Sequence, residues 1–189
     1  TATTEIYTLS LHDVFRSGRS HREVAHTLEL IRPGSTSDDH ARALAMFERA
    51  LSLARGLASG SPRSLAARRD LAECLALIGV QSQSVGRLDQ ALASMREAIE
   101  IRASIFAADE TPRNAWDLAK ALSDGAAIAA RAPQREGDAE LTQALEWYAQ
   151  SIAHLQGLHD RGLLAGDDPL LVGTMTAFAS IRAREKGSP

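Results

Sequence analysis

The sequence predicts an all-α protein, a solenoid built from antiparallel helical hairpins. The segment Asp-Leu-Ala-Glu-Cys-Leu that begins at Asp70 returns 47 residues later, at Asp117, as Asp-Leu-Ala-Lys-Ala-Leu. A second pattern, Ala-Leu followed after two residues by an aromatic residue or Met, begins at Ala43, Ala91 and Ala144. Because the two patterns alternate at a nearly constant offset, each repeat contains two helices, and such hairpins stack on one another to bury their apolar faces.

Helix starts are marked by proline. Ser61-Pro62, Thr111-Pro112 and Asp168-Pro169 each place a capping residue directly before a proline suited to the first helical position. We expect each pair to open the first helix of a repeat. Turns or helix ends are expected at the glycines, namely Gly86, Gly137 and those within residues 162–166.

Hydrophobic periodicity predicts eight helices and no strand. Their ranges are 5–16, 20–32, 37–58, 62–84, 88–108, 112–131, 138–160 and 169–185. The single domain comprises a flanking helix in 1–19, hairpins in 20–60, 61–110 and 111–161, and a capping helix in 168–186. Its interior is expected to contain Leu75, Met95, Leu122 and Tyr148, with the small residues Ala91 and Ala98 where helices approach closely.

Composition excludes several function classes. The net charge is −3 and aromatic residues make up only 4% of the chain, which argues against a nucleic-acid partner. No stretch is long and apolar enough for a membrane span, and no targeting segment precedes the helices, so we expect a cytoplasmic protein. Cys74 is the single cysteine and is expected to pack as a small apolar residue. The chain begins with Thr1 rather than Met, and we expect it to be part of a longer protein.

Within the repeats, Leu75-x2-Ile78-Gly79-x2-Ser82 followed by Ala91-x3-Met95-x2-Ala98 resembles the tetratricopeptide repeat (TPR). The chain departs from the usual pattern at Leu75 and Ser82, and 14 residues rather than about five precede Pro112. That longer form is similar to the TPR arrays of roughly 47–53 residues per repeat found in bacterial multidomain signalling proteins. The resemblance implies a right-handed superhelix whose inner surface is lined by the first helices and binds a peptide or protein segment.

The resemblance also implies which residues face the concave groove. They are Arg69, Glu73, Val80, Gln83, Trp116, Lys120, Ser123, Arg131 and Arg184. Trp116 has two interpretations, an anchor for the partner or an indole packed on the preceding hairpin.

Candidate catalytic groups all have structural explanations. His21 and His26, like His154 and His159, are five residues apart, which puts each pair off a common helical face. Paired carboxylates at 38–39, 109–110 and 167–168 lie at helix starts, where they cap backbone N–H groups. Neither a P-loop nor a nucleophile elbow is present. We therefore expect no enzyme activity, metal or cofactor.

These observations predict a non-catalytic protein–protein interaction module or scaffold. The alternative is a regulatory domain that senses a small ligand or peptide and controls an attached catalytic unit. Self-association through the edge of an incomplete N-terminal repeat is a third, weaker prediction.

Overall fold

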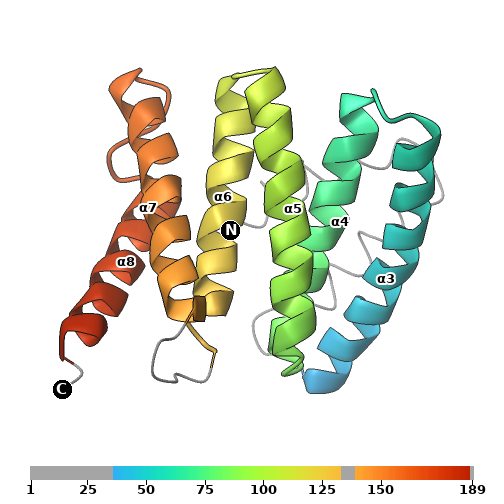
Figure 1. The fold of residues 1–189 in the computed structure, drawn as a ribbon, viewed down its shortest axis with the longest axis horizontal. Helices are drawn as coiled ribbons and strands as arrows, with labels where there is room; N and C mark the ends of the chain where they lie inside the picture. The colour runs from blue at the N-terminus through green and yellow to red at the C-terminus, as the bar shows by residue number, and fades with distance from the viewer. Residues whose placement is uncertain (1–35, 133–138, 188–189) are drawn as a thin grey trace. The chain divides into compact units, whose positions relative to one another are not determined.

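The computed structural model describes residues 36–132 and 139–187, and these residues are all-α (Figure 1). The six helices are α3 (Ser37–Gly60), α4 (Leu65–Ser84), α5 (Leu88–Ala108), α6 (Pro112–Ala129), α7 (Ala139–Asp160) and α8 (Pro169–Gly187). The structure thus describes six helices rather than the eight expected. The two expected at 5–16 and 20–32, together with Gly137, lie outside the described residues. None of these six helices has an apolar stretch long enough to cross a bilayer.

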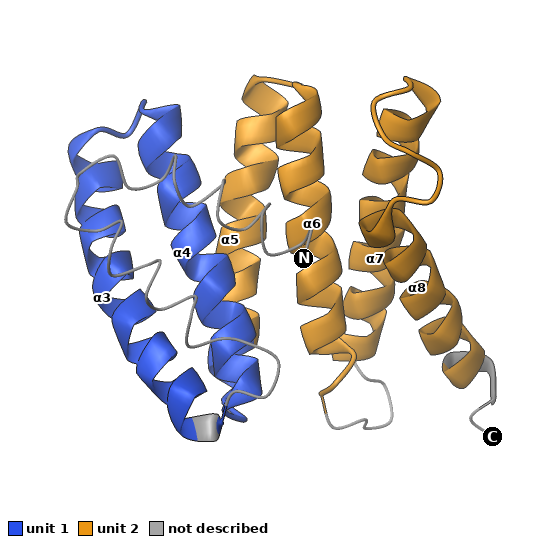
Figure 2. Cartoon of the chain, turned by 180° about the vertical axis from the view of Figure 1, so that it is seen from behind, with its two compact units in different colours: residues 1–91 blue, residues 92–189 orange. Residues whose placement is uncertain are grey.

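The chain divides into two compact units, residues 1–91 and 92–189, which are coloured separately in Figure 2. In the first unit, α3 and α4 pack as an antiparallel pair. Ala43, Leu44 and Phe47 of α3 meet Leu77 and Ile78 of α4 to form its core. The Ala-Leu-x-x-aromatic pattern therefore supplies the buried side of α3, because residues three and four apart share one helical face.

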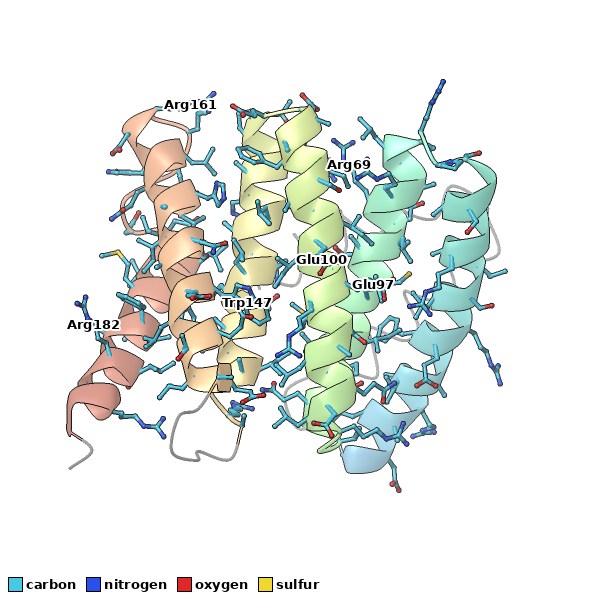
Figure 3. The ribbon with its side chains drawn as sticks, in the orientation of Figure 1. Arg69, Glu97, Glu100, Trp147, Arg161 and Arg182 are labelled. Atoms are coloured by element: carbon cyan, nitrogen blue, oxygen red, sulfur yellow. The ribbon has the colours of Figure 1, made fainter. Side chains whose placement is uncertain are left out.

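In the second unit, α5, α6, α7 and α8 follow one another in alternating directions (Figure 1). The helices approach closely at Gly125 of α6, where an added Cβ would lie 3.0 Å from Ile99 Cδ1 and 3.2 Å from the Trp147 ring. Figure 3 shows Trp147 on the side of α7 that faces α6. Ser151 adds a buried tie by donating to the carbonyl oxygen of Ala119 at 2.7 Å.

The predicted interior is confirmed. Leu75, Met95, Leu122 and Tyr148 are all buried, and so are Ala91 and Ala98. Cys74 is also buried, at 1% exposure.

Two of the three predicted proline-marked helix starts are confirmed. Thr111 caps α6 by accepting the backbone N–H of Asn114, and Asp168 caps α8 by accepting those of Leu170 and Leu171. The start predicted at Ser61-Pro62 is wrong. Ser61 instead closes α3, since its N–H donates to the Leu57 carbonyl, and Ser64 caps α4 three residues later by accepting the Ala67 N–H.

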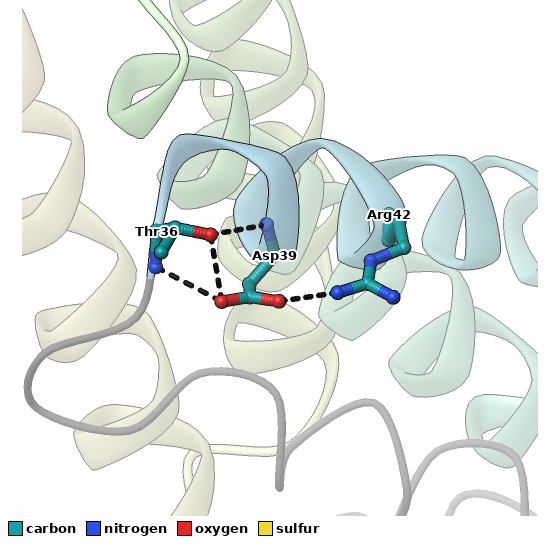
Figure 4. A network of polar contacts seen from close by, with 3 residues as sticks. All are labelled: Thr36, Asp39 and Arg42. Atoms are coloured by element: carbon teal, nitrogen blue, oxygen red, sulfur yellow. Dashed lines mark hydrogen bonds and ion pairs between the residues drawn. The ribbon is translucent and has the colours of Figure 1, made fainter.

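The first turn of α3 carries a capping box (Figure 4). The Thr36 hydroxyl accepts the Asp39 N–H at 3.2 Å, and the Asp39 carboxylate accepts the Thr36 N–H at 3.0 Å. Arg42 donates to the same carboxylate at 2.6 Å. The backbone and hydroxyl of Thr36, followed by Arg42, lower the pKa of Asp39 to about 2. This carboxylate has the capping role predicted for it.

Glycine ends two helices as predicted. Gly86 has φ +78°, its N–H donates to the Gln83 carbonyl, and the N–H of Arg87 donates to that of Ser82. Gly162, with φ +68°, makes the equivalent pair of bonds after α7. Both are Schellman motifs, in which the left-handed residue favours glycine because it has no Cβ.

Candidate interaction surface

Helix α6 has one buried side and one polar side. Its buried side consists of Asn114, Ala115, Leu118, Ala119, Ala121, Leu122, Gly125, Ala126, Ile128 and Ala129. The side that the buried residues leave open carries Lys120, Ser123, Asp124, Ala127 and, just past the helix end, Arg131. We call these five residues the α6 polar face. They recur at helical spacing and therefore form one continuous strip.

Oppositely charged side chains four residues apart form ion pairs along this side of α6. Lys120 Nζ lies 2.5 Å from Asp124 Oδ2, and two turns before this pair Arg113 lies 3.8 Å from Asp117. Such i,i+4 pairs at a partly exposed surface add only about 0.3–0.5 kcal/mol each, so their main effect is to hold the side chains in place. Ala127 and Arg131 are exposed, which leaves room for a partner at the C-terminal part of the strip.

Tyr148 of α7 borders the α6 polar face. Its ring is buried, and burial raises the pKa of its hydroxyl. The negative charge of Asp124 raises this pKa further, whereas the positive charge of Arg131 lowers it. Both charges are thus within electrostatic reach of the phenol, which stays protonated and able to donate a hydrogen bond at neutral pH.

Two of the residues expected in the groove contact other helices of the second unit. The Ser123 hydroxyl lies 2.9 Å from that of Thr174 and so links α6 to α8. Trp116 is half-buried and packs on the cluster of Ala119, Leu155 and Leu171. This contact agrees with the interpretation of Trp116 as a packed indole. Its role as an anchor for a partner stays a prediction.

The residues expected in the groove from the first unit share one side of α4. Arg69, Glu73, Val80 and Gln83 are each half-buried. Gln83 Nε2 is buried and has no hydrogen-bond partner within the described part of the chain. A buried donor of this kind gains free energy when a ligand carbonyl accepts from it. Arg184, expected in the same groove, is exposed near the end of α8 in the second unit. The nine predicted residues thus form separate sets in the two units.

Three residues were missed by the sequence analysis. Asp124 could have been found from its i,i+4 spacing to Lys120. The sequence indicates Asp70 only as part of the repeat. Burial, and to a smaller extent the negative charge of Glu73, raises the pKa of its carboxyl group to about 6. Tyr148 was read only as a core residue, and no sequence signal shows that its hydroxyl end borders a charged strip.

The remaining polar candidates have structural contacts. Burial, followed by Glu73 and Asp70, raises the pKa of the Cys74 thiol to about 12, which keeps it protonated and unreactive at neutral pH. His154 stacks edge-on against Phe106, and His159 Nδ1 donates to the Leu164 carbonyl. Across residues 36–132 and 139–187, no three His, Cys, Asp or Glu side chains gather as a metal site would require. His21 and His26 lie outside the described residues.

Comparison of the chain with protein-family models, with curated proteins and with solved structures gives no match. The residues that the structure describes are therefore defined only as an all-α arrangement of sequentially antiparallel helices, with a polar strip on α6.

Proposed function

We propose that the chain is a non-catalytic interaction module that binds a peptide or protein segment on the α6 polar face. The observation that carries this proposal is that one side of α6 is fully committed to the core while the opposite side presents ordered polar groups beside an exposed alanine. A strip that combines small, cationic and hydrogen-bonding residues suits the backbone and side chains of an extended or helical segment.

The internal repeat supports a TPR-type arrangement. In this proposal α4, α6 and α8 are the first helices of successive hairpins, and the hairpins stack as a right-handed solenoid. Binding of this kind requires neither a cofactor nor a catalytic step.

The test compares two variants with the same change in charge. Ala127→Glu with Arg131→Glu alters the α6 polar face, whereas Gln150→Glu with Arg161→Glu alters exposed positions elsewhere in the second unit. Gln150 lies two residues from Tyr148, and therefore on the opposite side of α7. Arg161 follows the end of α7 (Figure 3).

Peptides are selected against the unaltered protein from a displayed random library, and their affinities are measured by fluorescence polarisation. We expect the α6 variant to bind at least about tenfold more weakly, a loss of about 1.4 kcal/mol, and the control variant to bind as the unaltered protein does. Circular dichroism should show the same helix content in all three proteins. Equal affinity for the α6 variant, or failure to select any peptide, contradicts the proposal.

A further inference from the structure

The outer side of α8 is apolar and exposed to solvent. Val172 is 47% exposed and Met175 is 45% exposed, and Gly173, Thr176 and Ala179 beside them are exposed as well. Within the second unit α8 packs on α7 and touches α6, and in Figure 2 it lies in front of α7 with no other helix of that unit over it. Contiguous apolar surface of this kind marks contact sites.

Residues 169–181 contain no charged side chain over 13 positions. A helix that only packs on one side carries charged residues on its solvated side, as the Lys120–Asp124 pair of α6 illustrates. The uncharged outer side of α8 is therefore unlike a solvated surface and resembles the face of a helix that is covered.

Charge is confined to the two ends of α8. Asp167 and Asp168 precede its first turn, whereas Arg182, Arg184, Glu185 and Lys186 follow the uncharged stretch and together carry a net positive charge. Arg182 also lies over the Phe178 ring, 5.9 Å from the centroid, and points away from α7 in Figure 3. The helix dipole favours these signs at the ends, but it does not explain why the surface between them is apolar.

A helix with this pattern is complementary to a reversed copy of itself. With the crossing centred on Thr176, Gly173 lies opposite the partner's Ala179 and Val172 opposite the partner's Ser180, so small residues allow a close approach. Asp168 then lies opposite the partner's Arg184, and the acidic end of each helix meets the net positive end of the other. A two-fold axis produces both contacts at once, which is the commonest symmetry of homo-oligomers.

We propose that two copies of this chain associate through the outer side of α8, as an antiparallel helix pair centred on Thr176. The pair buries less than a standard interface of about 1,600 Å², so the dimer is a weak one with a dissociation constant in the micromolar range. This dimer is independent of peptide binding on the α6 polar face.

Sedimentation equilibrium on the full chain, over a range of about 5 to 500 μM, tests the proposal. The unaltered protein should pass from monomer to dimer. Thr176→Glu brings two like charges together at the axis and should weaken the dimer at least about tenfold, whereas Gln150→Glu on α7 should leave it unchanged. A monomer at every concentration, or a dimer that Thr176→Glu does not weaken, overturns the proposal.

Crosslinking tests the register separately. Thr176→Cys should form a disulfide-linked dimer on mild oxidation, and Gln150→Cys should not. The native Cys74 does not interfere because it is buried. If Gln150→Cys crosslinks as fast as Thr176→Cys, the centre of contact is elsewhere and the proposal fails.

Charge reversal tests the antiparallel direction. Arg184→Asp should weaken the dimer because it lies opposite Asp168 of the partner copy, and adding Asp168→Asn in the same chain, which keeps a capping residue at the start of α8, should restore part of the affinity. A double variant that is weaker than the single one contradicts the antiparallel pairing.

Discussion

Substituting Gly125 by alanine probes the packing that defines α6. Its Cβ would lie 3.0 Å from Ile99 Cδ1 and 3.2 Å from two atoms of the Trp147 ring. The end of the Ile99 side chain can move, but the buried indole cannot easily do so. Overpacking of this kind costs about 1–3 kcal/mol.

Gly157 provides the matched control. It lies inside α7, and an added Cβ there would meet no atom within 4 Å. Alanine gains about 0.5–1 kcal/mol over glycine within a helix, and this gain is common to both positions. The difference between the two variants therefore isolates the contact with Ile99 and Trp147.

We expect Gly157→Ala to raise the free energy of unfolding by about 0.5–1 kcal/mol. The free energy of unfolding of Gly125→Ala should be about 2 kcal/mol lower than that of Gly157→Ala. For a chain of this length, that difference corresponds to about 4–8 °C in Tm. Urea unfolding followed by tryptophan fluorescence is the assay, since both tryptophans, Trp116 and Trp147, belong to the second unit. Equal stabilisation by the two substitutions would refute the close approach of α5, α6 and α7.

Two further predictions concern the first unit. Asp70 has its pKa raised to about 6, so the folded state binds its proton more tightly than the unfolded state does, and stability is lost as pH rises from about 4 to 6. Asp70→Asn should therefore stabilise the protein at pH 7 by about 1 kcal/mol, after allowance for solvent screening, and give no gain below pH 4; an equal gain at both pH values in urea unfolding would contradict this origin. Ser64→Ala should cost about 1 kcal/mol by removing the cap of α4, whereas Ser61→Ala should stay within about 0.5 kcal/mol; the reverse order in thermal unfolding would mean that α4 begins at Pro62 after all.

Much of the local structure could be predicted because short-range rules determine it. Thr111 and Asp168 cap their helices as the sequence indicates, and Gly86 ends α4. The helix start predicted at Ser61-Pro62 is wrong because serine also occurs where a helix ends. The sequence alone does not show which of two nearby serines, Ser61 or Ser64, caps the next helix. Ser64 rather than Ser61 caps α4, because α3 continues to Gly60 and Ser61 closes it.

Surface contacts were harder to predict because they depend on which helices meet. Ser123 was assigned to a groove from the repeat register, yet its hydroxyl pairs with Thr174, 51 residues away. The pairing of Lys120 with Asp124 follows from helical spacing, but the nearby hydroxyl of Tyr148 depends on the angle at which α7 crosses α6. Local rules therefore identify the strip on α6, and only tertiary packing decides which of its groups are already engaged.

Chemical-shift mapping with a selected peptide tests the proposed interaction module most directly. On titration into labelled protein, the largest amide shifts should fall on residues 120–131 of the α6 polar face and on neighbouring residues of α7. Shifts confined to the outer side of α8, or spread evenly over both units, would contradict the proposal that α6 binds the partner.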